Sequence, residues 1–261
     1  MKPTYIRGRA DLINVPLPKE TRTYKPVSNE ELITVTLESI HQSGFTVEKE
    51  VYSSAREGMV SNGRYLIKDV NDSEMQLMVG WQNSYDKSAT LKFAIGTNIM
   101  ICSNGCVSGD WGAFRKKHTG EIQTFAPGQI SEFIRNADQS FIGIQSDREA
   151  MKQIEISPTV RAELLGRLLI EEQVLQSSQI NIIRREIVNP TYDYHSKGSL
   201  WELYQFTTFA LKEDHPSTWL QDHHRVHTFY TGIAGILHAS KPVLQIREAN
   251  QLDLFDGTQF N

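Results

Sequence analysis

The spacing of apolar residues changes from helical to alternating and back to helical along this 261-residue chain, and these changes restrict the folds open to it. Between Phe45 and Cys102, stretches of alternating apolar and polar residues are typical of strands with one buried face. After Pro127, apolar residues recur at helical spacing. This order predicts an α+β fold, in which a central sheet is followed by a helical half. Strands are expected at residues 45–52, 65–70, 75–81, 90–95 and 98–102.

Short turn signals separate some of the expected strands. Asn62-Gly63 and Asn71-Asp72 are residue pairs that favour tight turns between neighbouring strands. Parallel strands would instead need long crossover connections. The middle of the chain is therefore predicted to form an antiparallel sheet of about five strands.

A capping box marks the start of a helix before the sheet. Ser28 precedes Glu31 by three positions and Gly44 follows the apolar face, so a helix is predicted between them. Residues 1–27 hold four of the nine prolines and are expected to form an extended arm. Later helices are expected at residues 129–144, 158–176, 199–212 and 217–239.

These elements divide the chain into parts. The arm at residues 1–27 precedes a sheet region with its leading helix at 28–125. A helical region follows at 126–245, and a flexible tail at 246–261 ends the chain. The helical region either shares one core with the sheet or packs separately, and the sequence is compatible with both.

Composition limits where the protein works. No stretch approaches the roughly 18 apolar residues of a membrane helix, and the first residues lack a signal-peptide apolar region. The two cysteines, Cys102 and Cys106, do not make a disulfide framework. We therefore expect a cytoplasmic protein without a membrane partner. The net charge of −4 argues against nucleic-acid binding by overall charge, so any such site must be a local basic patch.

The densest basic segment follows the predicted sheet. Cations can bind phosphates while aromatic rings stack on bases, a combination that holds single-stranded nucleic acid. The alternative is a solvated loop whose two aromatic side chains turn into the core. The candidate nucleic-acid-binding residues are Trp111, Phe114, Arg115, Lys116, Lys117 and His118.

Metal and enzyme chemistry have weaker signals. His223 and His227 share a helical face, but no Glu lies between them as in the H-E-x-x-H pattern. Cys102, Cys106 and His118 supply too few ligands for a typical structural zinc site. The chain also contains no G-x-x-x-x-G-K loop and no G-x-S-x-G elbow. We expect a non-enzymatic protein with no cofactor, no catalytic residue and no metal site.

Several segments resemble a known family. They are residues 22–31, 83–93, 98–105, 117–122 and 200–207. Together they are similar to the family of phage- and plasmid-related proteins of unknown function, over roughly residues 22–230. The chain departs from the family at Lys87, where members often have Gly. The resemblance implies a mobile-element origin and brings no catalytic residue with it.

The C-terminal tail carries a second resemblance. Gln251, Leu252, Asp253, Leu254 and Phe255 read Q-L-D-L-F, which resembles the pentapeptide that docks bacterial proteins on the DNA sliding clamp. In that motif the Gln is held in a polar pocket and the final Leu and Phe fill an apolar groove. The alternative is a terminal segment that packs on the body of the protein.

Together these features predict an accessory protein of DNA replication or recombination, encoded by a phage or plasmid and acting in a bacterial host cell. It would bind single-stranded DNA, with strand annealing as one such role, and its tail would recruit it to the host sliding clamp. A homo-oligomer would gain from multivalent clamp binding. One alternative is a protein that blocks or redirects the clamp, or counters host defence, without binding DNA. Another is a metal-dependent enzyme that uses the His-rich C-terminal helix.

Overall fold

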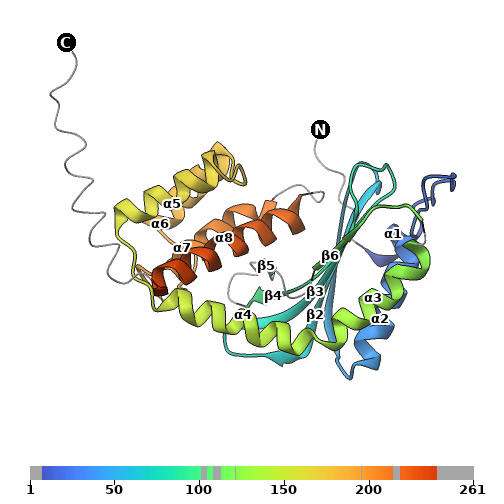
Figure 1. Cartoon of the computed structure of the whole chain (residues 1–261), viewed down its shortest axis with the longest axis horizontal. Coiled ribbons are helices and arrows are strands. Elements are labelled where there is room, and N and C mark those ends of the chain that lie inside the picture. The colour runs from blue at the N-terminus through green and yellow to red at the C-terminus, as the bar shows by residue number, and fades with distance from the viewer. Residues whose placement is uncertain are drawn as a thin grey trace, which may run out of the picture.

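A computed structural model describes residues 8–100, 105–107, 113–120, 122–194, 196–213 and 218–239. The α+β prediction is confirmed: one antiparallel sheet lies between two groups of helices (Figure 1). The strands are β1 (Val47–Ala55), β2 (Val60–Asn71), β3 (Met75–Ser84), β4 (Leu91–Ile99), β5 (Gly105–Val107) and β6 (Ala113–Lys116). The helices are α1 (Arg9–Ile13), α2 (Asn29–Gln42), α3 (Ile122–Arg135), α4 (Ala137–Lys152), α5 (Pro158–Ile170), α6 (Ser177–Val188), α7 (Leu200–Ala210) and α8 (Trp219–Ala239).

The long strands β1 to β4 pair in chain order, and the short strands β5 and β6 both pair with β4. Two strands were expected at residues 90–95 and 98–102, but a single strand, β4, covers most of that stretch. Gly96 and Thr97 do not interrupt it, because they stay in register with Met78 and Leu77 of β3. Residues 101–104 lie outside the described part of the chain.

The turn predicted at Asn62-Gly63 is wrong, because both residues lie inside β2. The β1–β2 turn is built instead by Arg56, Glu57 and Gly58, all with positive φ. Gly63 is needed for close packing rather than for a turn. A Cβ atom there would lie 2.5 Å from Cε2 of Trp81 on the neighbouring strand.

The first predicted helix is confirmed as α2. Ser28 Oγ accepts a hydrogen bond of 3.0 Å from the backbone N–H of Glu31, and Gly44 has φ +82° just beyond the helix end. The arm is not wholly extended, since it contains α1. Leu12 of α1 is fully buried, and its carbonyl accepts a hydrogen bond from the Asn29 side chain, so tertiary packing favours the short helix.

The helical half differs from expectation in three places. The helix expected at residues 129–144 is two helices, α3 and α4, separated at Asn136. Helix α3 also begins before Pro127, because Ile122 and Ala126 are buried in the core and extend the helix towards the N-terminus. Helix α6 was not predicted. The remaining predictions match α5, α7 and α8, with shorter bounds.

Both faces of the sheet are covered by helices. One face contributes to a large apolar cluster with α2, α3 and α4, and the same cluster includes residues of α5 and α7. The other face packs Met78 and Ala94 against Trp219 and Leu220 at the start of α8. Figure 1 shows the sheet between α2 and α3 on one side and α7 and α8 on the other. Most of the described core is therefore one apolar cluster shared by the sheet and the helices, and a second, smaller cluster lies under the start of α8.

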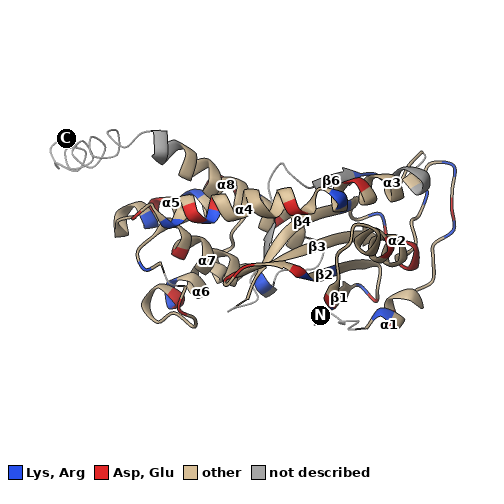
Figure 2. Ribbon diagram, turned by 90° about the horizontal axis from the view of Figure 1, so that it is seen from below, with Lys and Arg blue, Asp and Glu red and all other residues tan. Residues whose placement is uncertain are grey.

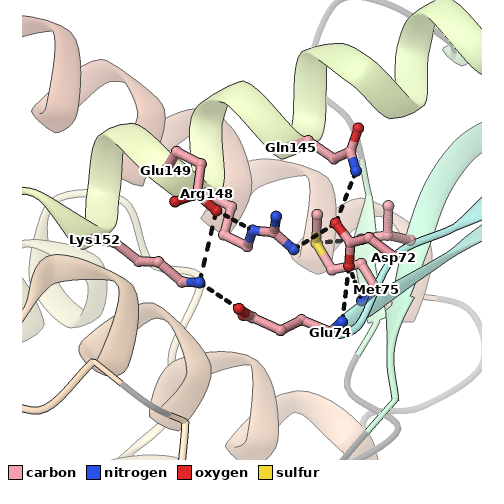
Figure 3. Close-up of polar contacts among 8 residues, drawn as sticks. Asp72, Glu74, Met75, Gln145, Arg148, Glu149 and Lys152 are labelled. Atoms are coloured by element: carbon pink, nitrogen blue, oxygen red, sulfur yellow. Dashed lines mark hydrogen bonds and ion pairs between the residues drawn. The ribbon is translucent and has the colours of Figure 1, made fainter.

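An ion-pair network holds α4 against the β2–β3 turn (Figure 3). Asp72 Oδ2 accepts hydrogen bonds from Arg148 Nη1 at 2.8 Å and from Gln145 Nε2 at 2.7 Å. Its Oδ1 accepts bonds from the backbone N–H groups of Glu74 and Met75. Burial alone would raise the pKa of Asp72, but these hydrogen bonds outweigh burial and lower it. Lys152 also contacts Glu74.

Replacing Arg148 should test this network. The Arg148→Met variant keeps the aliphatic bulk but leaves Asp72 without its cation, so we expect the free energy of unfolding to fall by about 2–3 kcal/mol. Denaturant unfolding of both proteins would measure the difference. The control is Arg167→Met, which breaks an exposed pair with Glu171 on α5 and should cost about 0.5 kcal/mol or less. Equal losses in the two variants would contradict a docking role for Arg148.

Candidate functional site

A pocket of about 520 Å³ lies where the arm, the sheet and the start of α8 meet, and we call it the lysine pocket. Its walls come from four stretches of chain that are distant in sequence. They are Thr23 and Tyr24 of the arm, residues 87–90 together with Lys92 at the start of β4, residues 117–119 after β6, and Thr218 and Gln221 at the start of α8.

Three lysines, Lys87, Lys92 and Lys117, line this pocket together with the hydroxyl groups of Ser and Thr residues. Among the described residues that line it there is no Asp or Glu. Elsewhere on the protein, positive and negative side chains occur together. Figure 2 shows basic and acidic residues side by side on α5, and the net charge of the chain is −4. The pocket is thus a locally positive site on an acidic protein, which suits an anion.

The turn after β3 sets the position of Lys87. Asp86 Oδ1 accepts hydrogen bonds from the Ser88 backbone N–H at 2.9 Å and from Ser84 Oγ at 3.0 Å. Its Oδ2 pairs with Arg56 at 2.7 Å. Burial would raise the pKa of Asp86, but these hydrogen bonds lower it to about 2, so the carboxylate remains charged and holds the turn.

Lys87 itself has φ +64°, a backbone conformation that glycine adopts most easily. The Lys87 ammonium group lies 4.7 Å from the centre of the Tyr24 ring, a cation–π contact that keeps it at the mouth of the pocket.

Lys92 links the sheet to α8. Its ammonium group donates a hydrogen bond of 3.0 Å to Gln221 Oε1. On the same face of the sheet, the Arg64 guanidinium lies 4.7 Å from the Trp219 ring, and burial lowers the pKa of Arg64. Asp222 nearby is half-buried. Its partial burial raises its pKa, and Thr218, Arg225 and Lys92 oppose this shift. Beside the pocket, this face of the sheet therefore carries the Arg64 cation and the acidic Asp222.

His118 is buried in the wall of the pocket, with 5% of its surface exposed. Its ring centre lies 5.7 Å from that of Tyr24. Burial lowers the pKa of His118, and the backbone of Lys25 opposes this shift. Neither ring nitrogen has a hydrogen-bond partner of normal geometry among the described residues.

The other predicted nucleic-acid-binding residues are only partly described. Lys117 is exposed and lines the pocket, and Lys116 is half-buried at the end of β6. Phe114 and Arg115 pair with Phe93 and Lys92 through their backbones, but their side chains lie outside the described part. Trp111 lies outside the described residues, as does the tail Gln251 to Phe255.

The two candidate metal ligands lie in the core. His227 Nε2 is 3.2 Å from Asp147 Oδ2, and its Nδ1 is 3.3 Å from the Tyr204 hydroxyl. His223 packs against Trp219, with 4.7 Å between ring centres. No group of three or more potential His, Cys, Asp or Glu ligands occurs within the described ranges. These contacts fit packing and hydrogen-bonding roles for both histidines.

Sequence reasoning identified Lys117 and His118 but missed Lys87, Lys92, Thr90 and Gln221. Lys87 stood out in the sequence only as a departure from the resemblance, and a strand lysine such as Lys92 gives no signal. Only the fold shows that these residues converge.

Comparison with known proteins gives one match. A family model described as a domain of unknown function (DUF932) matches residues 16–233, which cover every segment of the lysine pocket. No curated protein and no solved structure matches the chain. None of the described helices is long and apolar enough to cross a membrane.

Burial of His118 predicts a dependence of stability on pH. Its pKa is lowered in the folded state, so the unfolded chain takes up the proton first as the pH falls below about 6.5. The stability that neutral His118 provides is therefore present above that pH and is lost from there down to the lowered folded pKa. Urea unfolding at pH 7.5 and pH 5.5 should show that His118→Phe gains stability relative to the wild type at the lower pH. A pH-independent difference would contradict this assignment.

Proposed function

The chain belongs to the DUF932 family, whose function is unknown, and we propose that it is a phage- or plasmid-encoded accessory protein of DNA replication or recombination. In this role it binds single-stranded DNA, and strand annealing is one activity that such binding serves. The tail Gln251 to Phe255 recruits it to the sliding clamp of the bacterial host, where it acts in the cytoplasm.

The observation that carries the DNA-binding proposal is the lysine pocket. Lys87, Lys92 and Lys117 converge around one cavity whose described lining has no acidic side chain. Phosphate groups are the part of a nucleic acid that lysines bind, without regard to base sequence. Trp111 and Phe114 lie close in sequence to Lys117, and aromatic rings beside cations favour single strands through stacking.

The clamp-binding proposal depends on the tail sequence. Gln251 provides a polar anchor, and Leu252, Leu254 and Phe255 provide apolar surface to bury. An exposed linear peptide loses conformational entropy when it binds, so micromolar affinity is expected for a single tail. Several copies on one clamp ring would bind more tightly through multivalency.

Charge reversal in the pocket tests DNA binding. In Lys87→Glu with Lys117→Glu, two phosphate contacts are lost. We expect the slope of log affinity against log salt concentration to fall by about 1.4. Fluorescence anisotropy with a labelled single strand, at several salt concentrations, would measure it. The control is Lys49→Glu, an equivalent charge change at an exposed site on β1, the opposite edge of the sheet. If the pocket variant kept both the affinity and the slope of the wild type, the pocket would not be the DNA site.

A separate change tests the tail. Leu254→Ala with Phe255→Ala should weaken binding to the purified host clamp by roughly 100-fold, since two large apolar side chains are no longer buried. Isothermal titration calorimetry would measure it. Asp253→Ala is the matched control, because the middle of the motif tolerates change. Clamp binding without any DNA binding would instead support a protein that blocks or redirects the clamp.

A further inference from the structure

The lysine pocket concentrates charge at one point. Lys87 and Lys92, near the start of β4, and Lys117, after β6, line a single cavity of about 520 Å³. A phosphodiester in the middle of a strand carries a single negative charge. A phosphomonoester carries about −1.5 to −2 at neutral pH and has three strong acceptor oxygens. Three lysines around a cavity whose described lining has no acidic side chain therefore match a phosphomonoester better than a phosphodiester.

The pocket offers no open surface for stacking a base. Tyr24 is an aromatic side chain in the lining, and only 5% of its surface is exposed. Its ring is covered by the Lys87 ammonium group at 4.7 Å and contacts the His118 ring at 5.7 Å. Grooves that track a continuous single strand combine cations with accessible aromatic faces. The described lining of this pocket suits the phosphate group alone.

Two polar side chains, Thr90 and His118, are buried in the pocket wall, and the Lys25 backbone is the polar group that influences the His118 ring. Thr90 Oγ1 and both ring nitrogens of His118 are inaccessible and have no hydrogen-bond partner of normal geometry within the described residues. Buried polar atoms without a partner are rare in native proteins and require an explanation. Both residues line the pocket, so a rotation of each side chain would let a bound anion accept hydrogen bonds from the Thr90 hydroxyl and from one imidazole N–H of His118.

We propose that the lysine pocket binds a phosphomonoester dianion, and that in the DNA-binding role this group is the terminal phosphate of a strand. The assignment of the phosphate to the end of a DNA strand rests on the proposed function. The affinity of the pocket for a dianion does not depend on that function. Inorganic phosphate and a mononucleotide present the same dianion without a strand. Lys87, Lys92 and Lys117 neutralise its charge, while Thr90 and His118 donate to its oxygens.

The test compares three versions of one internally labelled single strand, with a 5′-phosphate, with a 3′-phosphate, or with neither. One phosphorylated strand should bind about tenfold more tightly than the unphosphorylated one, as expected for one or two hydrogen bonds to a charged group. Lys87→Gln and His118→Phe should remove that preference. Lys87→Gln lies at an exposed position, so it remains informative if His118→Phe does not fold, and Lys49→Gln is its control.

A second measurement separates this inference from the proposed function. The NMR signals of the His118 ring should shift when inorganic phosphate or thymidine 5′-monophosphate is added, whether or not DNA binds. If the three strands bind equally and charge reversal weakens them all, DNA binding stands and end recognition is overturned. If no strand binds but the His118 signals shift, the dianion site stands and the DNA-binding role fails. If neither occurs, both proposals are wrong.

Discussion

The central sheet must be covered on both faces, and the arrangement of the rest of the chain follows from that requirement. Every residue of β3 is buried, so neither face of the sheet can meet water there. Helices α2 to α4 cover one face, and the start of α8 covers the other with Trp219 and Leu220. The Asp72–Arg148 pair then fixes α4 on the β2–β3 turn, because a charge buried without its partner would be costly.

The lysine pocket is a consequence of this packing. The start of α8 covers the sheet near the beginning of β4, where the arm and the segment after β6 also meet. Backbone groups fix the shape of its rim: Lys25 N–H donates a hydrogen bond of 2.8 Å to the His118 carbonyl. The turn after β3, which Asp86 holds through its hydrogen bond with the Ser88 N–H, brings Lys87 to the same pocket. Cations that would otherwise be ordinary surface residues are thereby held around one cavity.

Local signals in the sequence predicted the elements that depend on them. Ser28 and Glu31 marked α2, and alternation marked the first three strands. Helix α6 was missed because its N-cap is Gln176, paired with Gln179, rather than the more usual Ser, Thr, Asp or Asn. Gly63 was misread because a glycine that allows Trp81 to approach looks the same in the sequence as a glycine in a turn. The site was predicted only at Lys117 and His118, since its other residues meet through tertiary structure.

The most direct test of the account is photocrosslinking of the unaltered full-length protein to a single strand that carries photoreactive thymidines, followed by mass spectrometry. The account predicts cross-links in the peptides that contain the pocket-lining residues 87–92 and 117–119. Cross-links confined to α5 and α6, or no binding even at low salt, would contradict it.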